Sequence, residues 1–162
     1  MASWLTLYAI RPMDGLSASA LEQRLRQSDW LTLAEGAGLD EQAAGALDPR
    51  FTRPGPDGAF DGELRYAPDR RPIVPHRWTS AERVAEERDE ALEVEPPDGA
   101  RRFVAGAVEV VGLEMGWSAH EDGGAIVACE VARLLARHQP GATALRDDDR
   151  WYVLDDWAWR RL

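Results

Sequence analysis

The sequence has a single cysteine, no lysine and no long hydrophobic run. Cys129 has no second cysteine to pair with, so no internal disulfide can form and nothing indicates an oxidising compartment. The first apolar segment, residues 4–10, is short, lacks a basic segment before it and runs into Arg11 and Pro12, which is not the pattern of a signal peptide. No apolar run approaches the length of a membrane span. These absences predict a cytoplasmic protein without a membrane partner.

Positive charge is also scarce. The chain has 29 acidic and 19 basic residues and a formal net charge of -10. Nucleic-acid affinity depends on clustered basic side chains that release counterions, often with interleaved aromatic residues, and the sequence has no such cluster. We therefore expect no nucleic-acid partner and favour a basic protein partner. The exclusive use of Arg is typical of a GC-rich coding sequence and indicates no function.

Cofactor motifs are missing as well. No glycine-rich turn has the spacing of a phosphate loop or a dinucleotide fold. His120, Glu121 and Asp122 are adjacent in sequence, and neighbouring residues on one loop rarely point at the same ion. The three aspartates at 147–149 lack the alternating ligands and terminal Glu of a calcium loop. We expect neither a cofactor nor a metal ion.

Cys129 is the candidate nucleophile, with His120 or His138 as its base. It lies nine residues from each histidine, so His138 would be far along the helix axis. A mid-helix cysteine beside Val127 and Val131 more often fills a core than carries out catalysis. The sequence predicts that Cys129 is buried and inert.

The remaining composition is that of an ordinary globular protein. With 162 residues, 44% of them hydrophobic, the chain can bury a substantial core, and we expect one domain over residues 1–162. The patterns predict helices from Ser17 or Ser19 to about Ser28, over 80–93 and over 124–138, with short helical turns within 30–47 and a loop over 48–62. Strands are expected at 4–10, 63–67, 73–78, 103–115, 142–145 and 151–154; the helix-like spacing within 103–115 leaves a helix open there.

Strands that come mostly in antiparallel pairs, with helices between them, favour an α+β fold. We expect a two-layer sandwich in which a mostly antiparallel sheet packs with about three helices. Both faces of segment 4–10 carry apolar residues, which predicts a central strand for that segment. No internal repeat is visible.

Two features suggest a binding surface. The predicted helix over 80–93 has a thin apolar stripe and many acidic residues, and two of the seven tryptophans lie in the C-terminal tail. Such a tail either folds back on the domain, the favoured alternative, or meets a partner. The candidate partner-binding residues form two alternative docking surfaces for a basic partner: Glu86, Glu87, Asp89 and Glu90 on this helix, or the acidic residues Asp147, Asp148 and Asp149 together with Trp157 and Trp159 of the tail.

Residues 131–152 (VARLLARHQPGATALRDDDRWY) read as a helix that runs into a short hairpin with an acidic tip. This segment resembles the C-terminal parts of bacterial immunity proteins that neutralise polymorphic toxins. The resemblance implies a stoichiometric inhibitor that occludes a cognate toxin, often through acidic groups that face a basic active site. It carries over no catalytic residue.

Two other classes stay open. An enzyme with an unfamiliar site would need converging polar residues in a pocket, with His76, Glu114, His120 and Glu121 as candidates. A structural subunit would show a large apolar patch and self-association. The oligomeric state and the activity of a partner are not encoded in any recognisable motif.

Overall fold

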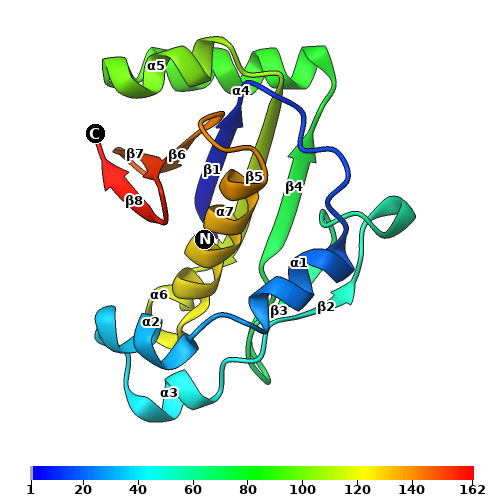
Figure 1. Cartoon of the computed structure of the whole chain (residues 1–162), viewed down its shortest axis with the longest axis vertical. Coiled ribbons are helices and arrows are strands. Elements are labelled where there is room, and N and C mark those ends of the chain that lie inside the picture. The colour runs from blue at the N-terminus through cyan, green and yellow to red at the C-terminus, as the bar shows by residue number, and fades with distance from the viewer. Residues whose placement is uncertain (1) are drawn as a thin grey trace. The chain divides into compact units, whose positions relative to one another are not determined.

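The computed structural model describes residues 2–162, which form α-helices, one short 3₁₀ helix and β-strands (Figure 1). In chain order the elements are β1 (Ala2–Ala9), α1 (Ala18–Leu25), α2 (Trp30–Gly36), α3 (Glu41–Gly45), β2 (Arg50–Arg53), η1 (Pro56–Gly58), β3 (Glu63–Arg65), β4 (Val74–Trp78), α4 (Ala81–Glu93), α5 (Asp98–Ala105), β5 (Glu109–Gly116), α6 (Ala119–Asp122), α7 (Gly124–His138), β6 (Thr143–Asp147), β7 (Arg150–Asp155) and β8 (Ala158–Arg161).

The chain divides into two compact units. The first holds residues 16–75 and 113–131 with the start of β1, and the second holds residues 4–15, 76–112 and 132–162. Each unit is therefore described by itself. The single domain expected over 1–162 stays a prediction.

The larger sheet has six strands in the order β4-β5-β1-β6-β7-β8, and the smaller sheet pairs β2 with β3. β1 lies antiparallel to β6, with Leu7 opposite Leu145, and the β6–β7 and β7–β8 hairpins are antiparallel as well. The predicted α+β fold with a mostly antiparallel sheet is confirmed. So is the central place of β1, which lies between β5 and β6.

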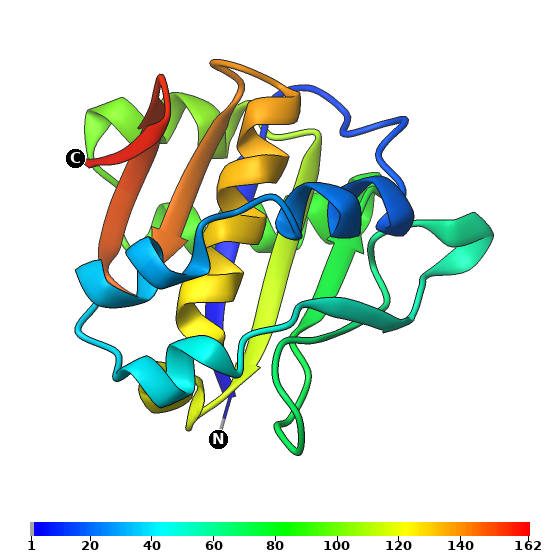
Figure 2. The same ribbon diagram turned by 60° about the horizontal axis from the view of Figure 1, so that its bottom comes forward.

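The second unit has a core on one face of this sheet. Tyr8 of β1 and Ala144 of β6 are opposite each other and buried, and both belong to a cluster with Val84 of α4 and Phe103 of α5. Figure 2 shows α4 and α5 behind the strands and the C-terminal turns of α7 on the opposite face. Val84 therefore packs α4 onto the face of the sheet that carries Tyr8 of β1.

The first unit is held by helix caps and by a buried tyrosine. Ser17, rather than Ser19, caps α1 by accepting a hydrogen bond from the Ala20 amide at 3.0 Å. The Tyr66 hydroxyl donates to Asp122 at 2.7 Å. Burial, reinforced by this carboxylate, raises the pKa of Tyr66 well above its usual value, so it remains a neutral donor.

Helices predicted over 17–28, 80–93 and 124–138 correspond to α1, α4 and α7, and the short turns within 30–47 are α2 and α3. The strand predicted from Phe103 is wrong at its start, because residues up to Ala105 end α5 and the strand begins at Glu109. Ala100, Phe103 and Val104 are buried together, at the spacing of a helix face. The expected loop over 48–62 also contains β2, which pairs with β3.

Cys129 is exposed, so the prediction that it is buried is wrong. Its neighbours Ala128 and Val131 are buried. Residues next to each other on a helix point in different directions, and Cys129 falls on the solvent side of α7. Its predicted inertness stays a prediction.

Among residues 2–162, no helix combines the length and the hydropathy that crossing a membrane requires.

Candidate functional site

A pocket of about 330 Å³ opens in the second unit. Strands β1, β4 and β6 supply its sheet side, and α4 supplies its helical side. Its lining residues are Trp4, Thr6, Tyr8, Trp78, Arg83, Glu87, Glu90, Arg146 and Asp148. We refer to it as the acidic pocket, because it contains three carboxylates against two guanidinium groups.

The sheet side of the acidic pocket follows from strand alternation. Trp4, Thr6 and Tyr8 lie two residues apart on β1 and share one face. Arg146 of β6 is opposite Thr6. The same face is therefore apolar and buried at Tyr8, and increasingly open towards Trp4, which is 39% exposed.

A glycine makes room for the aromatic wall of the acidic pocket. A Cβ atom on Gly112 of β5 would lie 2.8 Å from the Trp78 indole and 3.0 Å from that of Trp4. The two indoles stack with ring centroids 6.3 Å apart, and the His76 ring lies 5.2 Å from Trp4. Gly112 thus lets the indoles rest directly on the sheet.

The helical side carries the charge. Arg83, Glu87 and Glu90 recur at intervals of four and three residues, which places them on one face of α4. Arg83 pairs with Glu87 and donates to Glu86 at 2.8 Å. Its guanidinium also lies 5.1 Å from the Trp78 ring centroid, a cation–π contact.

Burial raises the pKa of Glu87, and the neighbouring carboxylates of Glu90 and Glu86 raise it further, while Arg83 opposes them. The pKa of Tyr8 is also raised, chiefly by burial. The acidic pocket therefore disfavours further negative charge, which means that a cation entering it would relieve the repulsion.

The tip of the β6–β7 hairpin lines the acidic pocket at the end nearer Trp4, because Asp147 lies opposite Leu5. Asp148 has a positive φ of 56°, and its carbonyl oxygen accepts a hydrogen bond from Arg146 Nε at 2.9 Å. Asp148 and Asp149 also line a second hollow of about 460 Å³, which includes Trp151. The structure thus brings together two regions that the sequence offers as alternative docking surfaces, the acidic helix and the hairpin tip.

Other predicted binding residues lie outside the lining of the acidic pocket. Glu86 is exposed beside Arg83. The side chain of Asp89 is 70% exposed, and its Oδ1 atom lies 3.6 Å from Nε of Arg88. Asp147 is half-buried in β6, opposite Leu5.

The C-terminal tail folds back, as the favoured prediction stated. Trp159 is half-buried in β8, opposite Leu154 of β7. Trp157 is 57% exposed, and the guanidinium of Arg137 of α7 lies 3.2 Å from its ring centroid. Its indole is therefore partly covered by the chain's own helix, and Trp157 is not among the residues that line the acidic pocket.

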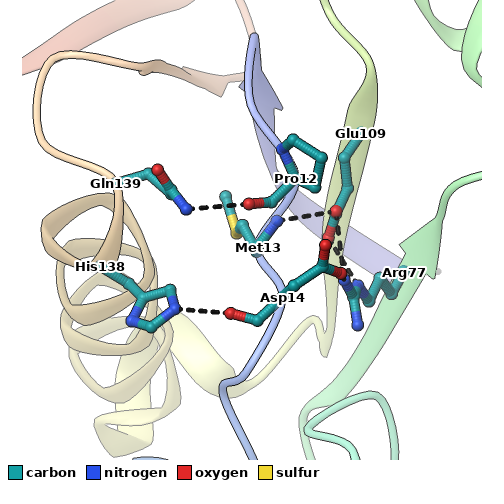
Figure 3. A network of polar contacts seen from close by, with 7 residues as sticks. All are labelled: Pro12, Met13, Asp14, Arg77, Glu109, His138 and Gln139. Atoms are coloured by element: carbon teal, nitrogen blue, oxygen red, sulfur yellow. Dashed lines mark hydrogen bonds and ion pairs between the residues drawn. The ribbon is translucent and has the colours of Figure 1, made fainter.

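A second cluster of polar residues in the same unit surrounds the buried carboxylate of Glu109, and we refer to it as the closed group (Figure 3). Glu109 of β5 is only 1% exposed and accepts hydrogen bonds from Arg77 Nε at 2.6 Å and from the Met13 amide at 2.9 Å. Arg77 also pairs with Asp14 at 3.2 Å. The pKa of Arg77 is raised, mainly by its hydrogen bond to Glu109.

The same loop is bound from α7. His138 Nε2 lies 2.9 Å from the carbonyl oxygen of Asp14, and the Gln139 side chain donates to the Pro12 carbonyl at 2.9 Å. These contacts hold the connection that follows β1 against β4, β5 and the end of α7 (Figure 3). The feature of the sequence that could have predicted this cluster is Glu109, a carboxylate inside the apolar run that follows Ala107.

Three of the four candidates for an unfamiliar enzyme, His76, His120 and Glu114, contact other side chains. His76 stacks on Trp78 in the second unit at 5.8 Å between centroids. In the first unit, His120 lies 3.1 Å from the Ser3 hydroxyl, Glu114 pairs with Arg71 at 3.0 Å, and Glu121 is exposed on α6. Over the described range 2–162, no group of three or more His, Cys, Asp or Glu side chains could hold a metal ion.

The comparisons with protein-family models, curated proteins and solved structures found no match to this chain.

Proposed function

We propose that this chain is a small acidic binding protein of bacterial origin that neutralises a cognate toxin by direct stoichiometric association, the role of an immunity protein. The observation that carries the proposal is the acidic pocket, in which carboxylates of α4 and of the β6–β7 tip converge beside exposed aromatic surface. Tryptophan and arginine are the residue types that most often dominate binding energy at protein interfaces.

The charge distribution supports a basic partner. The net charge of -10 repels nucleic acid and attracts a cationic protein surface, which accelerates encounter. Toxins that act on nucleic acids need basic active sites, and an acidic inhibitor can cover such a site without any chemistry of its own. In this proposal the protein acts in the cytoplasm, needs no cofactor and does not engage membranes.

The direct test uses the product of a toxin-like gene found beside this one. Co-expression should protect cells from that toxin, and the two purified proteins should form a complex with one copy of each. A variant with E90Q and D148N should protect less well, whereas E35Q with E93Q, a matched change at two exposed positions, should protect as well as the wild type. Failure of the purified pair to associate would contradict the proposal.

A further inference from the structure

We propose that the acidic pocket binds the guanidinium group of an arginine side chain that projects from the basic partner. The inference rests on the proposed function for the identity of the partner, and it adds the chemical group that is recognised. It depends on three features of the acidic pocket: its aromatic wall, the arrangement of its charges and its size.

The aromatic wall suits a planar cation. Trp4 and Trp78 stand side by side on the sheet, and 39% of Trp4 is exposed. A guanidinium group over an indole gains a cation–π attraction, and it is less strongly hydrated than an ammonium group, so that it leaves water more easily. The chain already shows this preference, because its own Arg83 lies 5.1 Å from the centre of the Trp78 ring.

The charges of the acidic pocket are incompletely neutralised. Arg83 is engaged by two carboxylates, those of Glu86 and Glu87. Arg146 donates to the carbonyl oxygen of Asp148 rather than to its carboxylate. For residues 2–162, no ion pair is found for the carboxylate of Glu90 or for that of Asp148.

These two carboxylates come from separate elements, α4 and the β6–β7 tip, and line the same pocket. A guanidinium group carries five N–H donors arranged in a plane, so one group can donate to carboxylates in two directions at once. The ammonium group of lysine has neither the plane nor the stacking surface. The combination of an indole wall with two carboxylates therefore favours arginine over lysine.

The volume fits one side chain. At about 330 Å³ the acidic pocket is at the lower end of the range found for ligand sites, which begins at about 300 Å³. It is open to solvent at Trp4 and at Asp148, so a side chain held by another protein can enter.

The test uses the intact chain and a minimal probe, N-acetyl-arginine methylamide. Titration is followed by the NMR signals of the indole N–H groups, assigned with W4F and W78F. The signals of Trp4 and Trp78 should shift in a saturable way, and that of Trp157 should stay in place. The citrulline analogue of the probe, which has nearly the same shape and no charge, should produce no saturable shift, and the lysine analogue should bind at least threefold more weakly than arginine.

Two matched variants locate the charge. E90Q with D148N should weaken binding of the arginine probe at least fivefold, whereas E35Q with E93Q should leave it within twofold of the wild type. Asn is chosen at 148 because it tolerates the positive φ there. The indole N–H signals without probe report whether each variant keeps the wild-type fold.

The outcomes separate this inference from the proposed function. If the arginine and citrulline probes give the same response, or if both double variants bind the arginine probe like the wild type, the inference is wrong even when the toxin complex forms. If the arginine probe binds as expected and the toxin does not, the inference stands and the proposed function is wrong. Saturable binding of inorganic phosphate in place of the arginine probe would also overturn the inference.

Discussion

The acidic pocket and the closed group around Glu109 use the same chemistry in different surroundings. Both set an arginine against carboxylates in the second unit. Glu109 is 1% exposed and the side chain of Arg77 is 18% exposed, whereas in the acidic pocket the side chain of Arg83 is 46% exposed and that of its partner Glu87 is 15% exposed. Removing one partner of a buried ion pair destabilises the fold, because the other charge is left buried and unpaired. Exposed charges, in contrast, remain available to another molecule. The buried charges of the closed group therefore serve the fold, whereas the more exposed charges of the acidic pocket can serve binding.

The largest effect should come from breaking the closed pair. Glu109→Ala leaves Arg77 without its main partner and the Met13 amide without an acceptor, and it should lower the free energy of unfolding by about 3–5 kcal/mol. Urea denaturation measures this change. Replacing both partners, R77M with E109L, should lower the free energy of unfolding less than E109A alone does, because the buried charge of Arg77 is then removed as well. An equal or larger loss would show that the effect of E109A does not come from leaving Arg77 unpaired.

The next effect concerns the aromatic wall. Gly112→Ala places a Cβ atom 2.8 Å from Trp78, so the indoles must move, and overpacking of this kind costs about 1–3 kcal/mol. Thermal unfolding should show the loss, and near-ultraviolet circular dichroism should show altered tryptophan packing. Gly36→Ala, where the new Cβ would meet no atom within 4 Å outside its own helix, is the control: it should not lower the thermal stability and should leave the circular dichroism close to the wild type.

Exposed acids should matter much less for folding. Glu86→Gln and Glu90→Gln should each change the free energy of unfolding by less than about 0.5 kcal/mol. Chemical denaturation of the two variants beside Glu109→Ala measures the contrast directly. A loss of several kcal/mol from either variant would mean that the acidic helix serves the fold, and that the distinction between the two regions is mistaken.

The smallest effect concerns pH. Burial raises the pKa of Glu87 above its ordinary value, so the native state binds a proton more readily than the unfolded chain does. The stability contributed by this group is present below the unfolded pKa and is lost as pH rises through the native pKa. In unfolding experiments at a series of pH values from 4 upwards, Glu87→Gln should show a weaker decline of stability than the wild type. Identical pH profiles would mean that Glu87 does not carry the shift.

Much of the fold is local in origin and could be predicted. The period of Val127, Val131 and Leu135 identifies α7, because side-chain spacing reports which face of a helix is buried. The strand β1 is recognised differently, because segment 4–10 is apolar on both faces, as a central strand is. The helix α5 could not be separated from β5 by pattern alone, since a short apolar run suits both structures. Cys129 shows the same limit, because a single helical residue beside two buried ones can still face solvent.

The candidate site was predicted in part. The acidic residues of α4 are visible in the sequence as more charge than the thin apolar stripe of that helix needs, and those of the hairpin tip are visible as a run of three aspartates. Their convergence in one pocket depends on the strand order, which brings β6 beside β1 and is not a local property. The aromatic wall depends on Gly112, whose role is apparent only when the indoles of Trp4 and Trp78 are placed over it.

The most direct test of the central claim is the association rate constant with the purified toxin, measured by stopped-flow fluorescence at several salt concentrations. The wild type should associate fastest at low salt, and E90Q with D148N should associate more slowly and with a shallower dependence on salt, because electrostatic steering comes from these charges. E35Q with E93Q, which removes the same net charge at two positions outside the pocket lining, should retain most of the rate. If both double variants follow the wild-type curve, the acidic pocket does not face the partner.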